Sequence, residues 1–546
     1  MFGLVSLGYA RLGDNRTVGT GERDMTSRVR WLLVFGLIVV TGAVGWAVYL
    51  GHVTPPTPPV ARARVHKGPI QPAFTEDQLK QFLRDARQAE AIPDPLQRCL
   101  AYPEPPGVRW SKAVTSAYCH YLLDPAVTEA QARELIESGH VAELEQKLAA
   151  AQQAQFTQEG AQSLLDRTYN IAFAGNTDDA RALMDAWLRQ APNSAYALAA
   201  SGTAYVAMAQ RQRGSAYTRE TSQSSFEAMH RLIERARDDL DRAVALDPKM
   251  TPAYAAMIHA GALDSDRAYA FQAAKGALAV DPASFPTYGR LVWMSQPKWG
   301  GTVAQMQRIV DAAQKHAPQN PLLRLLLSER SGGEDYVENC ACDPLDEDDL
   351  YRHVFAEAAP LRMLMSAGWA AANRNNIALS VVYRSELLRF DASQVDHRES
   401  RAFNLIMLGE PAWALDEGTA LVKLAPRDET AYDVLGQAHR ALGDASQAAN
   451  DFEQALRLNP TDTWTLAAVG DIYVNVTHEW DKAWTVANRL VQLNPDDPQG
   501  WFMRASIQRA QPREGLEQTV SDFAARFGKV PGNDALVAQM RAIKQR

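Results

Sequence analysis

The stretch ETAYDVLGQAHRALGDASQAANDFEQALRLNP, from Glu429 to Pro460, decides the fold of this chain. Apolar and small residues recur on both sides of Gly443-Asp444 at the spacing of amphipathic helices, which predicts a pair of helices. Glycine accepts the left-handed conformation in which helices commonly end, so Gly443-Asp444 is expected to form the turn between them. Proline cannot donate a backbone hydrogen bond, so Pro460 is expected to stop the second helix. The residues predicted to pack the pair together are Tyr432, Leu435, Gly436, Ala448, Phe452, Ala455 and Pro460.

The length of this unit recurs along the chain. Pro460 lies 34 residues after Pro426, and Pro495 lies 35 residues after Pro460. One inserted residue is therefore expected in the turn near Thr477–Trp480. Partial units of the same kind contain Gly175-Asn176, Ala180, Trp187 and Pro192, then Tyr254, Met257, Ala270, Ala274, Ala277 and Pro282, and then Gly409 and Ala414.

The small residues Gly436 and Ala448, which let two helices approach closely, complete a pattern that resembles the tetratricopeptide-repeat family, whose unit has 34 residues. The resemblance implies an all-α fold, a right-handed superhelical solenoid of antiparallel helix pairs. It also implies that the repeats bind other proteins. No stretch of the sequence shows a period-two alternation that would predict a β-strand.

A second resemblance concerns residues 75–345. The segment around Cys99 and Cys119, the insertion RGSAYTRETSQSS at Arg213–Ser225 and the motif PKWGG at Pro297–Gly301 are together similar to a bacterial domain-of-unknown-function family that combines with helical repeats. This resemblance implies no known activity.

Length and charge exclude other classes of protein. A chain of 546 residues is too long for one compact core, whereas a solenoid can grow because each repeat buries its apolar face only against its neighbours. The net charge of −8 argues against nucleic acid as a partner, because phosphates require a basic surface.

A membrane anchor is predicted at Trp31–Leu50, which reads WLLVFGLIVVTGAVGWAVYL and holds no charged residue. Twenty uncharged, mostly apolar residues span the hydrocarbon core of a bilayer as a helix, about 30 Å. Two alternatives are a buried core helix and a cleaved secretory signal. The Pro-rich continuation PPTPP at Pro55–Pro59 argues against the first, and the length of the apolar run argues against the second.

The orientation of this anchor follows from its flanking charges. Arg28 and Arg30 immediately precede the apolar run, whereas Arg62, Arg64 and Lys67 follow it at a distance. Positive residues next to a membrane helix favour the cytoplasmic side. We therefore expect a single-pass protein of the inner (cytoplasmic) membrane, with its N-terminus inside and its large domain periplasmic. A start at Met25 would leave this prediction unchanged.

The predicted organisation has six parts. The sequence indicates a cytoplasmic tail at residues 1–30, the transmembrane helix at 31–50, a Pro-rich stalk at 51–72, a helical domain with a cysteine pair at 73–150, degenerate helical repeats at 151–345 and tetratricopeptide-like repeats at 346–546.

The four cysteines form two local groups. Cys99 and Cys119 are candidates for a disulfide in an oxidising compartment, and the alternative is two buried free thiols. Cys340 and Cys342 lie in an acidic stretch, with His353 downstream. A metal site would use both thiolates, His353 and a carboxylate, but a lone C-x-C lacks the second pair that makes a zinc motif specific. A solvated loop with a local disulfide or free thiols is the favoured interpretation.

No catalytic motif emerges. His478-Glu479 begins like a metalloprotease helix, but Lys482 stands where the second histidine is required. The sequence contains neither the GxSxG motif nor a phosphate-binding glycine loop. We therefore expect no enzyme, no cofactor and no small-molecule substrate.

Three aromatic residues, Tyr432, Trp464 and Trp501, recur near the same edge of successive repeats. Packing between repeats is the favoured interpretation, and a strip that contacts a protein partner is the alternative. A clamp for a partner's terminal carboxylate would need Lys and Asn at fixed positions of the first helices. Asp433, Gln437, Ala467 and Asp471 occupy such positions instead.

These observations predict a membrane-anchored scaffold that mediates protein–protein interaction in the bacterial cell envelope. Its partners would be envelope proteins, with the bilayer contacted through the N-terminal helix. An alternative function is a metal- or redox-dependent envelope factor that uses the loop of Cys340 and Cys342. A related alternative is an accessory of cytochrome maturation or envelope assembly, by analogy of architecture alone.

Overall fold

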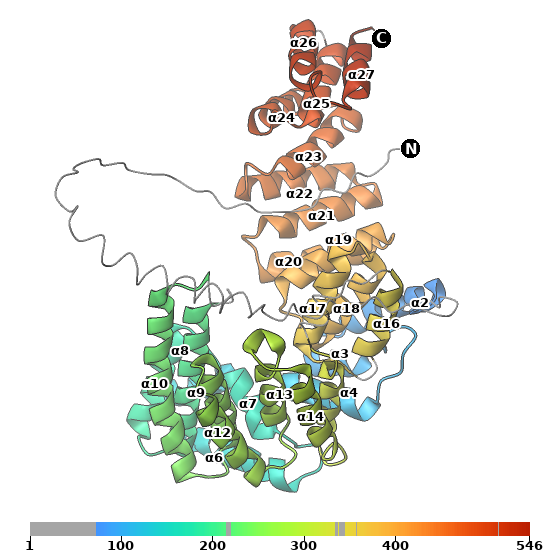
Figure 1. Ribbon diagram of the computed structural model, residues 1–546. Helices are drawn as coiled ribbons and strands as arrows, with labels where there is room; N and C mark the ends of the chain where they lie inside the picture. Colours follow the sequence, from blue (N-terminus) through green and yellow to red (C-terminus); the bar gives the residue numbers. More distant parts are fainter. Residues whose placement is uncertain are drawn as a thin grey trace, which may run out of the picture. The chain divides into compact units, whose positions relative to one another are not determined.

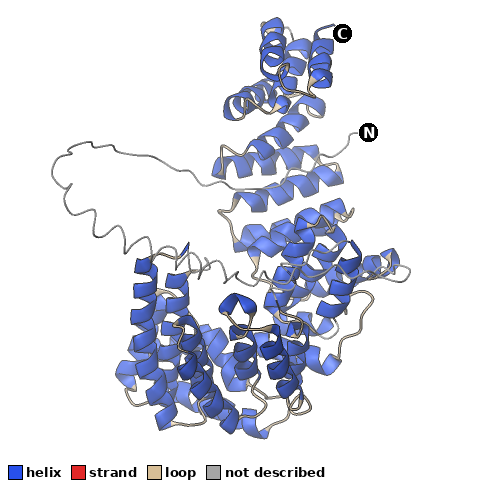
Figure 2. Cartoon of the chain, viewed as in Figure 1, coloured by secondary structure: helices blue, strands red, loops and turns tan. Residues whose placement is uncertain are grey.

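The computed structural model describes residues 73–214, 220–333, 337, 344–355, 358–511 and 513–545, all within one compact unit, Ala63–Arg546. Every regular element of these ranges is helical, which confirms the all-α class for the described residues (Figure 2). No described helix is both long and apolar enough to cross a membrane. The predicted tail, membrane helix and stalk, and the cysteines Cys340 and Cys342, lie outside the described residues.

The second half of the chain consists of helix pairs that stack in chain order (Figure 1). The first helix of each pair begins at Leu361, Val395, Glu429, Thr463 and Pro498, so the interval is 34 residues three times and then 35. The helices are α17 (Leu361–Asn373), α18 (Ile377–Phe390), α19 (Val395–Met407), α20 (Pro411–Leu424), α21 (Glu429–Leu442), α22 (Ala445–Leu458), α23 (Thr463–Asn475), α24 (Trp480–Leu493), α25 (Pro498–Ala510), α26 (Leu516–Phe527) and α27 (Asp534–Gln545).

The boundaries of α21 and α22 follow from local sequence. Asp428 and Asp444 cap the N-termini of the two helices, each accepting a hydrogen bond from a backbone N–H of the first turn. Gly443 ends α21 with φ of 86°, a left-handed conformation that costs glycine little. The extra residue of the next unit lies in the longer turn between α23 and α24, where His478 has a positive φ of 55°.

The first half of the chain also contains pairs, of less regular length. Here α11 and α13 begin at Thr251 and Phe285, again 34 residues apart, while α9 and α10 are longer. The elements are α5 (Glu129–Glu137), α6 (Val141–Thr157), α7 (Leu164–Ala172), α8 (Asp178–Gln190), α9 (Ala195–Arg213), α10 (Gln223–Leu246), α11 (Thr251–Leu263), α12 (Arg267–Val280), α13 (Phe285–Met294), η2 (Pro297–Trp299), α14 (Val303–Gln314) and η3 (Pro321–Glu329).

The first described helices, α2 (Glu76–Glu90), α3 (Pro95–Ala101) and α4 (Lys112–Leu123), do not share their core with α5 and α6. They pack instead with α16 (Pro344–Val354) and the pairs α17 to α21, in one apolar cluster (Figure 1). Aromatic contacts such as Trp110 on Phe355 and Tyr118 on Phe390 fill the junction. The N-terminal segment of the described chain is thus attached to repeats about 250 residues further on.

Candidate functional site

A pocket lies between four first helices of the irregular half. Helix α11 packs against α7, α9 and α13, and side chains of all four helices line a cavity of about 240 Å³. We call this cavity the first-helix pocket. Its polar lining includes Asp166 and Asn170 on α7, Thr203 and Gln210 on α9, His259 on α11 and Arg290 on α13.

Asp166 is the buried acidic group of the first-helix pocket. Its position in the first turn of α7 follows from Ser163, whose left-handed φ of 57° directs the chain into this short helix. The side chain is 2% exposed, both carboxylate oxygens are buried, and the Thr251 hydroxyl is in position to donate a hydrogen bond to them. Burial raises the pKa of the Asp166 carboxyl to about 7, against a smaller lowering by the nearby Thr251 hydroxyl. An acid in this environment resists ionisation until a cation approaches.

Basic groups reach the same pocket from α11 and α13. Among the described residues, no carboxylate pairs with the guanidinium of Arg290. Burial lowers the pKa of Arg290, and the neighbouring charge of Arg362 lowers it further. Burial also holds the pKa of His259 well below its usual value, with a smaller contribution from Arg290. His259 is therefore a neutral imidazole, and its ring meets Trp293 edge to face at 5.5 Å.

The lining of the first-helix pocket combines polar groups with small apolar residues. It offers a carboxyl group, a guanidinium, a neutral imidazole and several amide or hydroxyl groups, next to small apolar residues such as Ala207 and Ala256. A concave site with a few convergent polar groups is typical of a small-molecule site.

The residues predicted to pack the repeat lie around the α21–α22 contact. Ala448, Phe452 and Ala455 are buried on α22, and a Cβ added to Gly436 would lie 2.5 Å from the Phe452 ring. Leu435 is half-buried and faces Gly418 of α20. Tyr432 is half-buried and donates a hydrogen bond to the Pro426 carbonyl at 3.3 Å, while Pro460 is exposed directly after α22.

The three predicted edge aromatics occupy different environments. Tyr432 and Trp501 are both the fourth residue of their helices, and Trp501 is 7% exposed and donates to the Pro495 carbonyl at 3.0 Å. Trp464 is the second residue of α23, is 48% exposed and meets Phe403 edge to face at 6.0 Å. The burial of Trp501 fits the favoured interpretation of packing between repeats, whereas the exposed Trp464 could contact a partner.

At the positions of a carboxylate clamp, Asp433 and Gln437 are buried. Asp433 accepts a hydrogen bond from the Thr465 hydroxyl at 3.1 Å, and burial raises its pKa to about 8. Ala467 is buried as well, and Asp471 is exposed. These side chains offer no positive charge to a terminal carboxylate.

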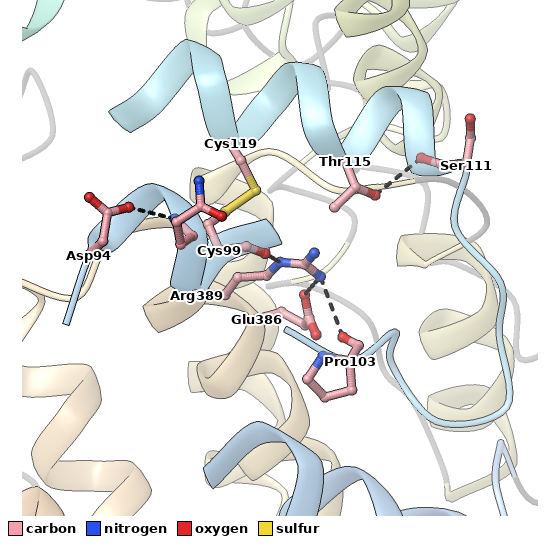
Figure 3. Close-up of a disulfide and its surroundings, with 9 residues drawn as sticks. Asp94, Cys99, Pro103, Ser111, Thr115, Cys119, Glu386 and Arg389 are labelled. Carbon is pink, nitrogen blue, oxygen red and sulfur yellow. Dashed lines mark hydrogen bonds and ion pairs between the residues drawn. A yellow bond between two sulfur atoms is a disulfide. The ribbon is translucent and has the colours of Figure 1, made fainter. Parts of the chain in front are cut away.

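Cys99 on α3 and Cys119 on α4 are joined by a disulfide with an S–S distance of 2.05 Å, and both residues are fully buried (Figure 3). Arg389 of α18 lies beside it. Its Nε donates to the Cys99 carbonyl at 2.9 Å and its Nη1 to the Pro103 carbonyl at 3.4 Å, while Glu386 supplies the countercharge at 3.3 Å. The linked helices are therefore bound to α18 through backbone carbonyls.

A buried ionic network that sequence reasoning missed joins α2 to the repeats. Arg401 of α19 donates to both carboxylate oxygens of Glu90, at 2.6 and 2.9 Å, and to Glu417 of α20 at 2.6 Å. Arg398 also pairs with Glu417, at 2.9 Å. Although burial opposes ionisation, the charge of Arg401 lowers the pKa of Glu90 to about 2, whereas burial raises that of Glu417 to about 7. No periodic signal connects these residues in the sequence.

The predicted metal alternative has one residue in the described part of the chain. His353 lies near the end of α16 and is half-buried. In the ranges that the structure describes, no three His, Cys, Asp or Glu side chains are grouped as metal ligands. The other two predicted ligands, Cys340 and Cys342, lie outside these ranges.

Comparison with known proteins identifies the regular repeat. Residues 430–462, which include α22 and all but the first residue of α21, match the sequence model of the tetratricopeptide repeat. This match supports the resemblance inferred from the 34-residue pattern. No curated protein matches the chain.

Several solved structures are similar to parts of the chain. The MamA protein is 18% identical, and the alignment covers 32% of this chain and 94% of that protein with a TM-score of 0.28. A thermophilic TPR protein of Thermus thermophilus is 20% identical over 34% of this chain and 100% of that protein, with a TM-score of 0.28. A tetratricopeptide repeat protein from Parabacteroides merdae is 12% identical over 54% of this chain and 99% of that protein, with a TM-score of 0.27.

Proposed function

We propose that this protein is a membrane-anchored scaffold that holds protein partners in the bacterial cell envelope. Tetratricopeptide repeats generally mediate interactions between proteins, because stacked pairs present an extended surface. The observation that carries the proposal is the unbroken series of first helices α17, α19, α21, α23 and α25, set at intervals of 34 or 35 residues. Such a series repeats one binding face along the stack.

The anchoring part of the proposal rests on sequence. The charge-free run of residues 31–50 is followed by the Pro-rich stretch 51–72, which would form an extended spacer between the bilayer and the helical body. With Arg28 and Arg30 on the cytoplasmic side, the repeats would face envelope proteins.

Two exposed tryptophans on first helices are the strongest candidate contacts. Trp369 on α17 is 44% exposed and covers the buried Arg384 guanidinium, 4.6 Å from the ring centroid. Trp464 on α23 is 48% exposed. Large, partly held aromatic side chains are enriched among the residues that dominate protein–protein binding.

Site-specific photo-crosslinking of the full-length chain in native membranes tests the scaffold. A photoreactive amino acid at Trp464 is expected to give a discrete adduct with an envelope protein. The matched control is Leu458, which is 41% exposed but lies at the end of the second helix α22. Equal adducts from both positions, or none from Trp464 and Trp369, would contradict binding through the first helices.

A further inference from the structure

An exposed aromatic contact links two first helices whose pairs are separated by a third. Trp464, the second residue of α23, is 48% exposed and meets Phe403 of α19 edge to face at 6.0 Å. Helix α21 follows α19 and precedes α23 in the stack (Figure 1), and its Asp433 accepts a hydrogen bond from Thr465 of α23 at 3.1 Å. The first helices α19, α21 and α23 therefore share one surface, and the two rings form its apolar centre.

Carboxyl groups lie beside Phe403 on this surface. Glu399 precedes Phe403 by four residues, so both side chains lie on one face of α19. Asp428, the N-cap of α21, is close enough to Glu399 for a hydrogen bond between the two carboxyl groups, and Asp396 lies one turn before Glu399. Burial and the negative charges of Asp428 and Asp396 raise the pKa of the Glu399 carboxyl to about 8. A cation placed here would relieve this repulsion.

The carboxylates continue on α23. Asp471 is exposed and follows Trp464 by seven residues, which is two turns further along the same face of the helix. We call these residues the acidic aromatic strip: Phe403, Trp464, Asp396, Glu399, Asp428 and Asp471.

The cations of these three helices do not balance the carboxylates of the strip. Helices α19, α21 and α23 and their N-caps are fully described, and they contain three arginines and no lysine. Arg398 and Arg401 are buried, and both are bound to Glu417 of α20. Arg440 is exposed, near the end of α21. A surface with this excess of exposed carboxylates attracts positive side chains and repels acidic ones.

We propose that the acidic aromatic strip binds a segment of a partner protein that is rich in arginine or lysine, with one cationic side chain on the Trp464 ring. This inference rests on the proposed scaffold function and gives the partner its chemistry. A guanidinium or ammonium group over the exposed ring gains a cation–π interaction, and its neighbours donate charge-assisted hydrogen bonds to the carboxylates.

Peptide binding to the purified full-length chain tests the charge of the partner. Three fluorescent peptides of equal length share the same apolar residues, and their remaining positions hold only arginine, only glutamine or only glutamate. In low salt, fluorescence anisotropy is expected to show that the arginine peptide binds at least roughly tenfold more tightly than the glutamine peptide, and that the glutamate peptide binds most weakly. Added salt should narrow the difference, because the strip is exposed.

Two matched double variants locate the binding. Asp396→Asn with Asp471→Asn removes two exposed carboxylates of the strip and should weaken binding of the arginine peptide by at least roughly fivefold. Asp481→Asn with Asp522→Asn removes the same charge from the second helices α24 and α26, and should bind the peptide like the native protein. Trp464→Ala should weaken binding several-fold, through loss of the ring. Circular dichroism and melting temperature establish that each variant is folded.

Failure of this inference can be told apart from failure of the scaffold. A photo-crosslinked adduct at Trp464, together with arginine and glutamine peptides that bind equally, would support the scaffold and overturn the basic partner. An adduct whose partner segment, identified by mass spectrometry, has a net negative charge would do the same. Equal losses of affinity in the two double variants would also overturn the proposal, because the attraction would then come from the net charge of the whole chain. If neither an adduct nor peptide binding is found, the scaffold function and the basic partner are both contradicted.

Discussion

Arg401 and Asp166 are both buried charged residues, but their surroundings assign them different roles. Arg401 is surrounded by two carboxylates, Glu90 and Glu417, which join α2 to the repeats. Breaking a buried pair of this kind by removing one partner typically costs about 3–5 kcal/mol. Asp166 has no such partner, so its ionised form opposes folding. A network of the first kind holds the structure together, whereas a buried carboxyl without a cationic partner makes stability depend on pH.

The burial of Asp166 predicts that the stability of the fold depends on pH. Its folded pKa of about 7 lies above the unfolded value of 3.8, so the protonated form stabilises the fold and this contribution is lost as the pH rises through 7. The groups near the carboxyl are Tyr121, Thr251 and Asp281, none of which is cationic. The free energy of unfolding of Asp166→Asn should therefore rise relative to that of the native protein between about pH 4 and about pH 8. The total change should be a few kcal/mol.

Thermal unfolding of both proteins across this pH range measures the effect of Asp166→Asn. The difference in melting temperature should change in the variant's favour as the pH rises. Asp496→Asn, which removes an exposed carboxylate, is the control for the loss of one negative charge. A difference in melting temperature that stays constant with pH for Asp166→Asn would contradict the raised pKa of the Asp166 carboxyl.

At the scale of the helix pair, close approach depends on glycine. A methyl group at Gly436 would lie 2.5 Å from the Phe452 ring, whereas nothing lies within 4 Å of one at Gly289 on α13. Gly436→Ala should therefore destabilise the chain by about 1–3 kcal/mol through overpacking. Gly289→Ala should instead stabilise it by up to about 1 kcal/mol, because alanine has the higher helix propensity. Melting temperatures that shift in the same direction would show that the α21–α22 contact yields to the added methyl.

The α3–α4 pair depends on its disulfide. Cys99 and Cys119 are separated by 20 residues, and closing a loop of this size stabilises by roughly 3 kcal/mol in the chain-entropy account. Double replacement of Cys99 and Cys119 by Ser should lower the melting temperature of the full-length chain, and prolonged reductant treatment should lower that of the native protein similarly. After the replacement, reductant should have little further effect. An unchanged melting temperature in both cases would show that the pair adds nothing to stability.

At the scale of the whole molecule, topology decides which partners the repeats can meet. The flanking residues Arg28 and Arg30 predict that residues 51–546 lie outside the cytoplasm. A reporter that is active only after export, fused after Arg546, should therefore be active in cells. Activity of a reporter that works only in the cytoplasm, fused at the same position, would reverse the prediction.

The regular repeats were predictable because their signals are local. Helix periodicity, a left-handed turn at Gly443 and a stop at Pro460 each depend on a few neighbouring residues, and a 34-residue interval carries them along the chain. The same signals placed Gly436 and Phe452 at one helix contact. The inserted residue near His478 was found in the same way, from the spacing of two prolines.

Tertiary structure alone decided what depends on contacts between distant segments. The bonds from Tyr351 to Pro106 and from Arg401 to Glu90 span 245 and 311 residues, and no period in the sequence relates their ends. For the same reason, the sequence could not tell that Trp501 is buried whereas Trp464 is exposed. That difference depends on the neighbours that each side chain meets in the folded chain. The first-helix pocket belongs to this class, because Asp166 and Arg290 line one cavity only when α7, α11 and α13 lie side by side. Local chemistry dictates which segments become helices, whereas burial and charge at a site depend on which helices become neighbours.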